Sequence, residues 1–274
     1  MKRRASRSVA VRPGREETEL VLGRGAVLEI LRAGRRRVEC VLVAEGVRET
    51  EVVARIVAMA AERGIPLERA RLDELERGGE KSHGIAAEVS PFPYETVEDI
   101  LGEAGRRGEA PLVVLLDEMQ DPQNFGTLLR TAEAAGVHGV IVPYRRTAGV
   151  TPAVVRSSAG ASEHLRIAAE NLARAVERLR EAGVTVVALE AHPAAAPLDA
   201  LDLTRPLGLV VGSEGGGIRR LVRERCDTSA WLPLQGRVGS LNAAVAGSIA
   251  LYLAWSRRRG SASRGEGIDA LRKA

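Results

Sequence analysis

Short apolar runs alternate with amphipathic stretches along most of the chain, and the alternation changes character near its middle. The first part, residues 18–90, reads as a compact α/β unit. It is predicted to contain helices over 23–32, 50–63 and around 73–77, and strands over 38–43 and 84–89.

The stretch that follows, residues 91–109, differs in composition. It combines two prolines and three glycines with many charged residues, which is typical of a linker, and it leaves room for a short helix over 96–104. We therefore place a domain boundary there.

A second alternation occupies residues 110–259. Its strands are short and almost wholly apolar, and helices separate them, a pattern that favours a parallel sheet covered on both faces. Ligands of such sheets bind beyond the carboxyl ends of the strands. Strands are expected over 112–116, 139–142, 184–189, 207–211 and 228–232, and helices over 125–135, 152–158, 172–181 and 243–258.

One apolar segment, residues 238–256, runs for 19 residues without a charge and so reaches the length of a membrane span. Its glycines, serines and asparagine argue against that reading, and Ser240 or Asn242 is a natural N-cap for a helix beginning at Ala243. A buried helix and no membrane association are expected.

Charge gathers at the two ends of the chain. The net charge is +4, yet residues 1–15 carry six basic residues and no acid, so we assign a basic arm to 1–17 and a basic tail to 260–274. Such ends favour a nucleic-acid partner, bound in a salt-dependent way, although they can equally serve as solubilising tails. Cys40 and Cys226 lie far apart with no histidine at ligand spacing, which disfavours disulfide scaffolds and zinc sites and indicates the cytoplasm.

Three loops at strand ends collect the scarce amides: all three Gln and two of the three Asn lie in or beside them. In the first, Asn124 can cap a helix on which Arg130 points away from the apolar face, free to meet solvent or an anionic substrate. The acids Asp117, Glu118 and Asp121 leave a metal-dependent phosphohydrolase open as a weak alternative.

The second loop, 209–218, places four glycines around Glu214, and the third, 231–242, joins a strand to a capped helix. Glycines of this kind let a backbone approach a ligand closely. The second loop lacks both the Walker pattern and the dinucleotide fingerprint, so nucleotide hydrolysis and dinucleotide binding lose support.

In this order the loops resemble the three motifs of the SpoU (TrmH) family of S-adenosylmethionine-dependent RNA ribose 2′-O-methyltransferases, within the SPOUT superfamily. The motifs are Asn-x-Gly-x-x-x-Arg-Thr-Ala at 124–132, Gly-Ser-Glu-Gly-x-Gly-Ile at 212–218 and Pro-x-x-Gly-x-Val-x-Ser-Leu-Asn at 233–242. Residues 21–29 and 82–87 resemble the borders of the family's small domain, which is similar to ribosomal protein L30e. The resemblance implies a trefoil-knotted parallel-sheet domain, preceded by an L30e-like α/β RNA-binding domain, in a homodimer.

The resemblance also implies roles for residues. Backbone groups around Gly212, Leu232, Leu234 and Leu241 would hold the methyl donor, S-adenosylmethionine, with no metal. Since an arginine is rarely neutral, we interpret the family's catalytic arginine, here Arg130, as a phosphate clamp that orients the ribose and assists proton removal. Catalytic positions carried over from the motifs are Arg130, Asn124, Glu214, Ser240 and Asn242.

The complete front domain is most similar to the branch that methylates a guanosine of 23S ribosomal RNA. A tRNA guanosine 2′-O-methyltransferase is the second reading. From a different class, a non-catalytic RNA-binding or ribosome-assembly factor could keep the fold, although the presence of both Asn124 and Arg130 argues against it.

Overall fold

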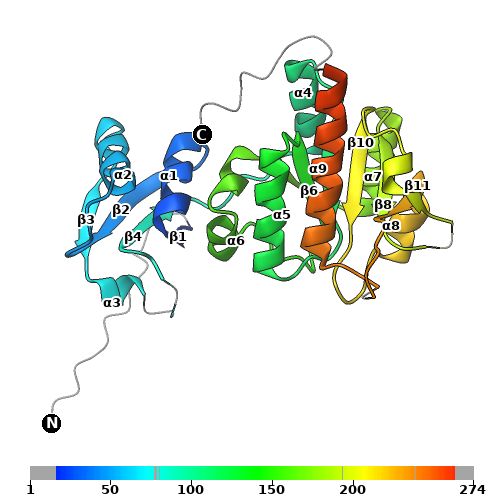
Figure 1. Cartoon of the computed structure of the whole chain (residues 1–274). Helices are drawn as coiled ribbons and strands as arrows, with labels where there is room; N and C mark the ends of the chain where they lie inside the picture. Colours follow the sequence, from blue (N-terminus) through cyan, green and yellow to red (C-terminus); the bar gives the residue numbers. More distant parts are fainter. Residues whose placement is uncertain (1–16, 77–78, 80, 193, 238, 263–274) are drawn as a thin grey trace.

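The computed structural model describes residues 17–262 except 77–78, 80, 193 and 238 (Figure 1). The expected basic arm and basic tail therefore lie almost wholly outside the described residues. Along the described chain a four-stranded sheet is followed by a seven-stranded one.

The first sheet has the order β1-β4-β2-β3, in which β4 is antiparallel to both its neighbours and β2 is parallel to β3. The predicted elements are present, but the two edge strands were not predicted. The sequence of β3, Leu-Glu-Arg-Ala, is polar and largely exposed, so it carries no apolar signal. The elements are β1 (Glu19–Leu22), α1 (Arg24–Ala33), β2 (Val38–Ala44), α2 (Glu51–Glu62), β3 (Leu67–Ala70), α3 (Leu72–Leu75) and β4 (Ile85–Val89).

The stretch expected to be a linker is mostly helical. Helix α4 (Val97–Arg107) begins at a capping box in which Thr96 and Asp99 bond each other's backbone N–H groups. Its apolar face is buried against the second sheet, where Ile100 fills the space above Gly139 that a Cβ would occupy. The short helix predicted within the linker, over 96–104, is therefore present and extends to Arg107.

The second sheet is parallel throughout, as expected, with the order β7-β6-β5-β10-β8-β11-β9. The chain moves outward from β5 to β7, crosses over, and returns to place β10 directly beside β5. The strands are β5 (Leu112–Leu116), β6 (Gly139–Val142), β7 (Ile167–Ala169), β8 (Thr185–Leu189), β9 (Ala196–Pro197), β10 (Leu207–Val211) and β11 (Thr228–Trp231). The two short edge strands, β7 and β9, were not predicted.

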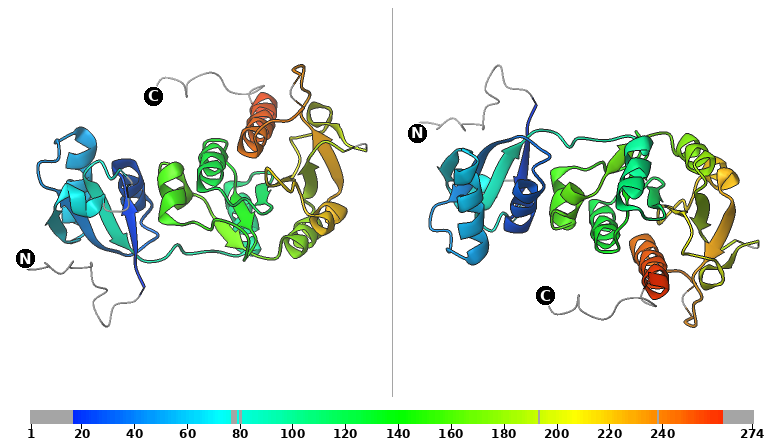
Figure 2. Two further views of the ribbon diagram at one scale, coloured as in Figure 1. Left: turned by 90° about the horizontal axis from the view of Figure 1, so that it is seen from below. Right: turned by 90° about the horizontal axis from the view of Figure 1, so that it is seen from above.

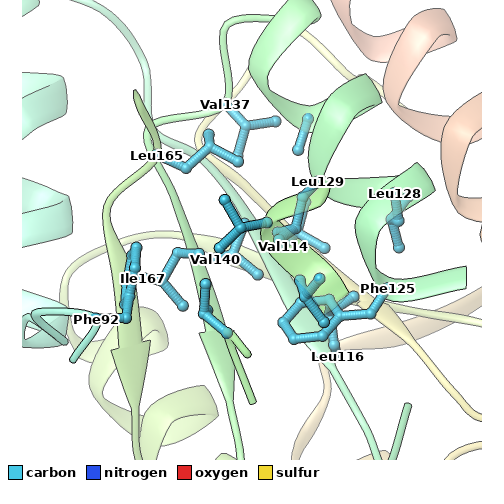
Figure 3. Close-up of a cluster of buried hydrophobic side chains, with 14 of the residues drawn as sticks. Phe92, Val114, Leu116, Phe125, Leu128, Leu129, Val137, Val140, Leu165 and Ile167 are labelled. Carbon is cyan, nitrogen blue, oxygen red and sulfur yellow. The ribbon is translucent and has the colours of Figure 1, made fainter. Parts of the chain in front are cut away.

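Helices cover both faces of this sheet (Figure 2). Alternate residues of β5 pack against opposite layers: Leu112, Val114 and Leu116 join one core cluster, and Val113 and Leu115 join the other. Figure 3 shows part of the first cluster, in which Phe125 and Leu129 lie close to Val114 and Leu116. The first layer contains α5 (Pro122–Ala134), α6 (Pro152–Ser157) and α9 (Ala243–Ala262), and the other contains α4, α7 (Leu172–Glu181) and α8 (Arg220–Arg225).

The uncharged segment near the end of the chain supplies most of α9, and Asn242 caps this helix as predicted, its Oδ1 accepting the Val245 N–H at 3.1 Å. Ala244, Ala250, Leu251 and Ala254 are buried on one side. No helix in the described part of the chain has the length and apolar character to cross a bilayer. The opposite side of α9 exposes a stripe of apolar residues, Val245, Ile249 and Tyr252.

Helix α1 of the first unit docks on the segment after α6. Gly160, at φ 86°, lies so close to Glu29 that a Cβ would meet the Glu29 Cβ at 2.5 Å. Beside it the buried Arg36 guanidinium bonds Glu19 and lies 3.4 Å from Glu163. Burial raises the pKa of the Glu163 carboxyl above its ordinary value, and Arg36 opposes that shift. Small residues and buried charge thus set the angle between the two units.

Both cysteines are free thiols. Burial raises the pKa of Cys40 to about 11 and that of Cys226 to about 12, so both stay protonated at neutral pH. Neither has the properties of a nucleophile or a metal ligand.

Gly126 supplies a test of the packing of α5 on α6. A Cβ at this position would lie 1.9 Å from the Ser157 Oγ and 2.7 Å from the Ser158 backbone nitrogen. We expect Gly126→Ala to lower the free energy of unfolding by about 1–3 kcal/mol, measured by urea denaturation. The control is Gly105→Ala in exposed α4, where a Cβ meets nothing within 4 Å; it should be neutral or stabilising by up to about 1 kcal/mol. Equal effects of the two substitutions would contradict this packing.

Candidate active site

The three loops that carry the motifs meet at one edge of the second sheet. Residues 117–121 follow the carboxyl end of β5, 212–219 follow β10, and 232–242 follow β11. The first two lie side by side because β5 and β10 are paired in register, Leu116 opposite Val211. This is the strand edge at which parallel sheets bind ligands.

A cavity of about 710 Å³ opens between the second and third loops. All four residues expected to hold a methyl donor, Gly212, Leu232, Leu234 and Leu241, line it. Leu234 and Leu241 are 40% and 39% exposed, so a ligand in the cavity would take apolar surface out of water. Its size and largely apolar lining are those of a small-molecule site. We call it the larger cavity.

Gly212 is required by the shape of the loop after β10. The chain turns back so tightly that a Cβ on Gly212 would lie 2.3 Å from the Gly217 carbonyl carbon and 2.6 Å from the Ile218 nitrogen. Ser213 and Gly217 exchange backbone hydrogen bonds of 3.1 and 3.0 Å across the turn. The close approach leaves backbone at the wall of the cavity, where a side chain would otherwise project.

Three predicted catalytic side chains, one from each motif, form a hydrogen-bonded cluster. The Asn124 Nδ2 donates to the Glu214 Oε1 at 2.9 Å, and its Oδ1 accepts from the Asn242 Nδ2 at 3.1 Å. The Asn242 Nδ2 also donates to Glu214. We call these residues the amide–carboxylate cluster. Glu214 and Asn242 line the larger cavity, so the cluster stands at its wall.

The other two predicted catalytic residues are placed differently. Ser240 lines the larger cavity but makes no hydrogen bond with another side chain of the described residues. Arg130 is exposed on α5 and lines neither this cavity nor its neighbour. Six residues of helix separate it from Asn124, which is about 9 Å along the axis.

Asn124 does not cap α5, although its place before the predicted helix suggested that it would. The helix begins three residues earlier than predicted, with Pro122 in its first turn, and Asp121 is the N-cap, accepting the Gln123 N–H at 3.1 Å and the Asn124 N–H at 3.4 Å. The Asn124 side chain is therefore free to join the cluster.

Asp117 has a structural role. Its side chain is fully buried, accepting the Arg219 backbone N–H at 2.8 Å and the Arg219 Nε–H at 2.7 Å. Both carboxylate oxygens are occupied in holding the loop after β10 to the end of β5. Within the described residues no three His, Cys, Asp or Glu side chains are grouped to hold a metal.

Sequence reasoning did not single out Glu190 and Trp231, which also line the larger cavity. Glu190 is 17% exposed, accepts from the Ser229 Oγ at 3.4 Å and lies 3.6 Å from an Arg223 nitrogen. Glu190 directly follows β8. Because parallel sheets bind ligands beyond the carboxyl ends of their strands, the sequence alone could have indicated this residue.

A second cavity, of about 420 Å³, adjoins the first. The two share Ser213, Glu214 and Ala243 in their walls, and Asn124 lines the second. We call it the smaller cavity. The amide–carboxylate cluster therefore stands between two compartments. The other residues that line the smaller cavity are Glu118, Met119, Gln120, Asp121, Gly215 and Gly216.

Comparison with known families assigns both parts of the chain. Residues 111–252 match the model of the SpoU rRNA Methylase family, and residues 20–95 match the domain described as RNA 2′-O ribose methyltransferase substrate binding. The chain is a member of the SpoU methylase family. The expected resemblance is confirmed, and the protein is an RNA 2′-O-methyltransferase.

Relatives and solved structures agree with this SpoU assignment. The putative TrmH family tRNA/rRNA methyltransferase YacO of Bacillus subtilis is 36% identical over 89% of this chain and 97% of its own length. An uncharacterised tRNA/rRNA methyltransferase of Mycobacterium avium is 42% identical over 89% of this chain and 79% of its own. The SpoU methyltransferase AviRb of Streptomyces viridochromogenes, in complex with AdoMet, superposes with a TM-score of 0.74 at 26% identity, covering 89% of this chain and 91% of AviRb.

The turn at Gly212 gives a test of the larger cavity of this SpoU protein. We expect Gly212→Ala to weaken binding of S-adenosylmethionine, measured by calorimetry, at least about tenfold, because the added Cβ displaces the backbone that lines the cavity. Gly215→Ala, in the same loop but with nothing within 4 Å of its Cβ, should bind normally. Unchanged affinity in Gly212→Ala, with the fold intact, would remove this loop from the donor site.

Proposed function

We propose that this protein transfers the methyl group of S-adenosylmethionine to a ribose 2′-hydroxyl of RNA, with a guanosine of 23S ribosomal RNA as its target. The observation that carries the proposal is the amide–carboxylate cluster at the wall between two adjoining cavities. A methyl transfer needs such an arrangement, because donor and acceptor must meet end to end across one short gap.

The larger cavity is the donor site. Its leucine side chains suit an adenine ring, and the backbone exposed beside Gly212 offers amides and carbonyls to the ring edge. Glu190 presents a carboxylate that can accept from ribose hydroxyls of the donor. AviRb and an rRNA methyltransferase of Sinorhizobium meliloti, TM-score 0.72 at 26% identity and covering 89% of this chain and 87% of that one, were both solved with AdoMet.

In the reaction the ribose 2′-oxygen attacks the methyl carbon, the carbon–sulfur bond breaks, and the sulfonium becomes the neutral thioether of S-adenosylhomocysteine. The hydroxyl proton passes to solvent water. Asn124 and Asn242 hold Glu214 rigidly, so that polar groups facing the hydroxyl are ordered before substrate arrives. Ser240, on the same cavity wall, shapes the site near the donor.

Arg130 acts as a phosphate clamp that orients the ribose and assists removal of its proton. Among the described residues it has no ion pair, it is exposed, and its guanidinium is suited to bidentate phosphate binding. Its separation from Asn124 along α5 is consistent with contact to a phosphate beside the reacting ribose.

The protein works as a homodimer through the face formed by α5 and α9. The apolar stripe of Val245, Ile249 and Tyr252 runs along one side of α9, 44%, 40% and 61% exposed, and α9 packs directly against α5, where Ser248 bonds Thr131 at 2.9 Å. A second copy covering the stripe would remove this apolar surface from water. A knotted path of the chain between β10 and α9 belongs to the same proposal.

The choice of 23S ribosomal RNA rests on the complete substrate-binding unit at residues 20–95 and on the basic character of the chain ends. The relatives are named for both tRNA and rRNA, so tRNA is the alternative target. The cytoplasm is the proposed location, supported by the two free cysteines.

Methyl transfer from labelled S-adenosylmethionine, to unmodified 23S ribosomal RNA and to unmodified tRNA at low and moderate salt, tests the function. Label on a guanosine 2′-oxygen of 23S RNA is expected. Label on tRNA alone would show that the substrate is tRNA and that the proposed reaction is correct. A protein that binds RNA and transfers no methyl group to either would be a non-catalytic factor.

Substitution of Arg130 tests its role in the same assay. We expect Arg130→Ala to lower kcat/KM at least about hundredfold with donor affinity unchanged, and Arg130→Lys to restore part of the loss, since a lysine still binds phosphate. Arg174→Ala, which removes an exposed arginine on α7, serves as the matched control. Normal turnover and RNA affinity in Arg130→Ala would refute the assignment.

The homodimer is tested by sedimentation of Ile249→Asp. A charge in the middle of the apolar stripe should shift the wild-type dimer to monomer at micromolar concentration without lowering the melting temperature of the monomer fold, because Ile249 is 40% exposed within one chain. Leu221→Asp, on exposed α8 of the opposite layer, should leave the mass unchanged. A monomeric wild-type protein would contradict the proposal.

A further inference from the structure

The smaller cavity has a position and a chemistry of its own. It shares a wall with the donor cavity through Ser213, Glu214 and Ala243, and Asn124 of the amide–carboxylate cluster lines it. Given the proposed function, on which this inference rests, the acceptor nucleoside must lie against that cluster from the side that the donor does not fill. The smaller cavity is the compartment on that side.

The lining of this cavity selects which part of a nucleotide enters. Three carboxylates, Glu118, Asp121 and Glu214, face a volume of about 420 Å³, and within the lining there is no cationic side chain. A phosphate would be repelled there. A neutral base whose edge carries hydrogen-bond donors is favoured, because a carboxylate only accepts.

Of the three acids, Glu118 combines a place on the smaller cavity alone with a carboxylate oxygen left unoccupied by the described residues. Asp121 uses both its oxygens to cap α5, and Glu214, whose Oε1 accepts from two amides, stands at the wall shared with the donor cavity. Arg146 and Arg219 both approach the same oxygen of Glu118, Oε1, at 3.4 and 3.6 Å. No other described residue bonds its Oε2, and the side chain is 21% exposed.

An unusual backbone conformation holds Glu118 at the wall of the smaller cavity. Its φ is 59°, in the left-handed region that a residue with a side chain seldom adopts. Strain of this kind is held by the surroundings: the neighbouring Asp117 is pinned to Arg219, and the Met119 carbonyl accepts the Ala148 N–H at 3.1 Å and the Thr147 hydroxyl at 3.1 Å. The loop is thus rigid before any ligand arrives.

We propose that the smaller cavity receives the base of the target nucleotide and that Glu118 selects guanine by accepting from its N1–H and N2–H₂ groups. These two donors lie side by side on one edge, in the spacing that a carboxylate accepts bidentately. Uracil offers a single donor flanked by carbonyl oxygens, which the carboxylates repel. Glu118 is therefore a specificity-determining residue, and Arg146 and Arg219 position it.

A cycle that combines a protein change with a base change tests this directly. The RNA substrate is prepared with guanosine or inosine at the methylated position, because inosine lacks only the N2 amino group. With wild-type protein, inosine should lower kcat/KM at least about tenfold. Glu118→Gln should lower kcat/KM on the guanosine substrate by a similar factor. For this variant the inosine substrate should lower kcat/KM little further, because the contact with the amino group is already lost.

Two controls isolate the effect. Binding of S-adenosylhomocysteine, measured by calorimetry, should be the same for wild type and Glu118→Gln, because Glu118 does not line the donor cavity. Glu133→Gln, which neutralises an exposed acid on α5 outside both cavities, should behave as wild type on both RNAs. The inosine comparison uses unaltered protein, so it stands even if the variant folds poorly.

Three results would overturn the inference while leaving the methyltransferase function intact: a mapped target other than guanosine, full activity of wild type on inosine, or losses from inosine and Glu118→Gln that multiply. Failure of the wild-type protein to methylate any RNA is a different result, since it removes the proposed function itself.

Discussion

The parallel pairing of β5 with β10 is the constraint on which the rest of the site depends. These strands are separated by some ninety residues of chain that build β6, β7, β8 and their helices, yet Leu116 and Val211 end side by side. The pairing continues past the strands, where the Asp117 N–H donates to the Val211 carbonyl at 2.8 Å and the Asp117 carboxylate holds Arg219. A buried acid bonded to backbone and guanidinium is costly to disturb, so the two loops are held as one rigid edge.

This rigid edge brings together the three side chains of the amide–carboxylate cluster. Asn124 enters from α5, Glu214 from the turn after β10, and Asn242 from the N-cap of α9, and each uses its polar atoms on the other two. Asn242 does two jobs with one side chain, because its Oδ1 caps α9 while its Nδ2 joins the cluster. The stability of α9 and the order of the site are therefore coupled through this residue.

Glycines determine how closely the loops and helices around the site approach one another. Gly212 lets the loop fold back on Gly217, Gly126 lets α5 rest on α6, and Gly247 brings α9 to within contact of Leu128 on α5 and Val211 on β10. These contacts hold α5 and α9 together and seat α9 on β10 beneath the site. The same logic joins the two units of the chain, where Gly160 admits α1 and the Arg36–Glu163 pair is buried beside it.

The sequence by itself determined the strong elements and the family. Apolar runs such as Leu112–Leu116 and Leu207–Val211 predict buried parallel strands because both their faces leave water. The motifs that contain Asn124, Glu214 and Asn242 resemble those of the SpoU family, and that resemblance implied the chemistry. The sequence could not show the exposed edge strand β3, which has no apolar pattern. It also could not show that α4 packs on the second sheet, because that contact depends on Ile100 meeting Gly139. Only the tertiary structure decided that Asp117 is a structural clasp, that Arg130 stands outside both cavities and that Glu118 faces the smaller one, because these are distances between residues that local sequence does not encode.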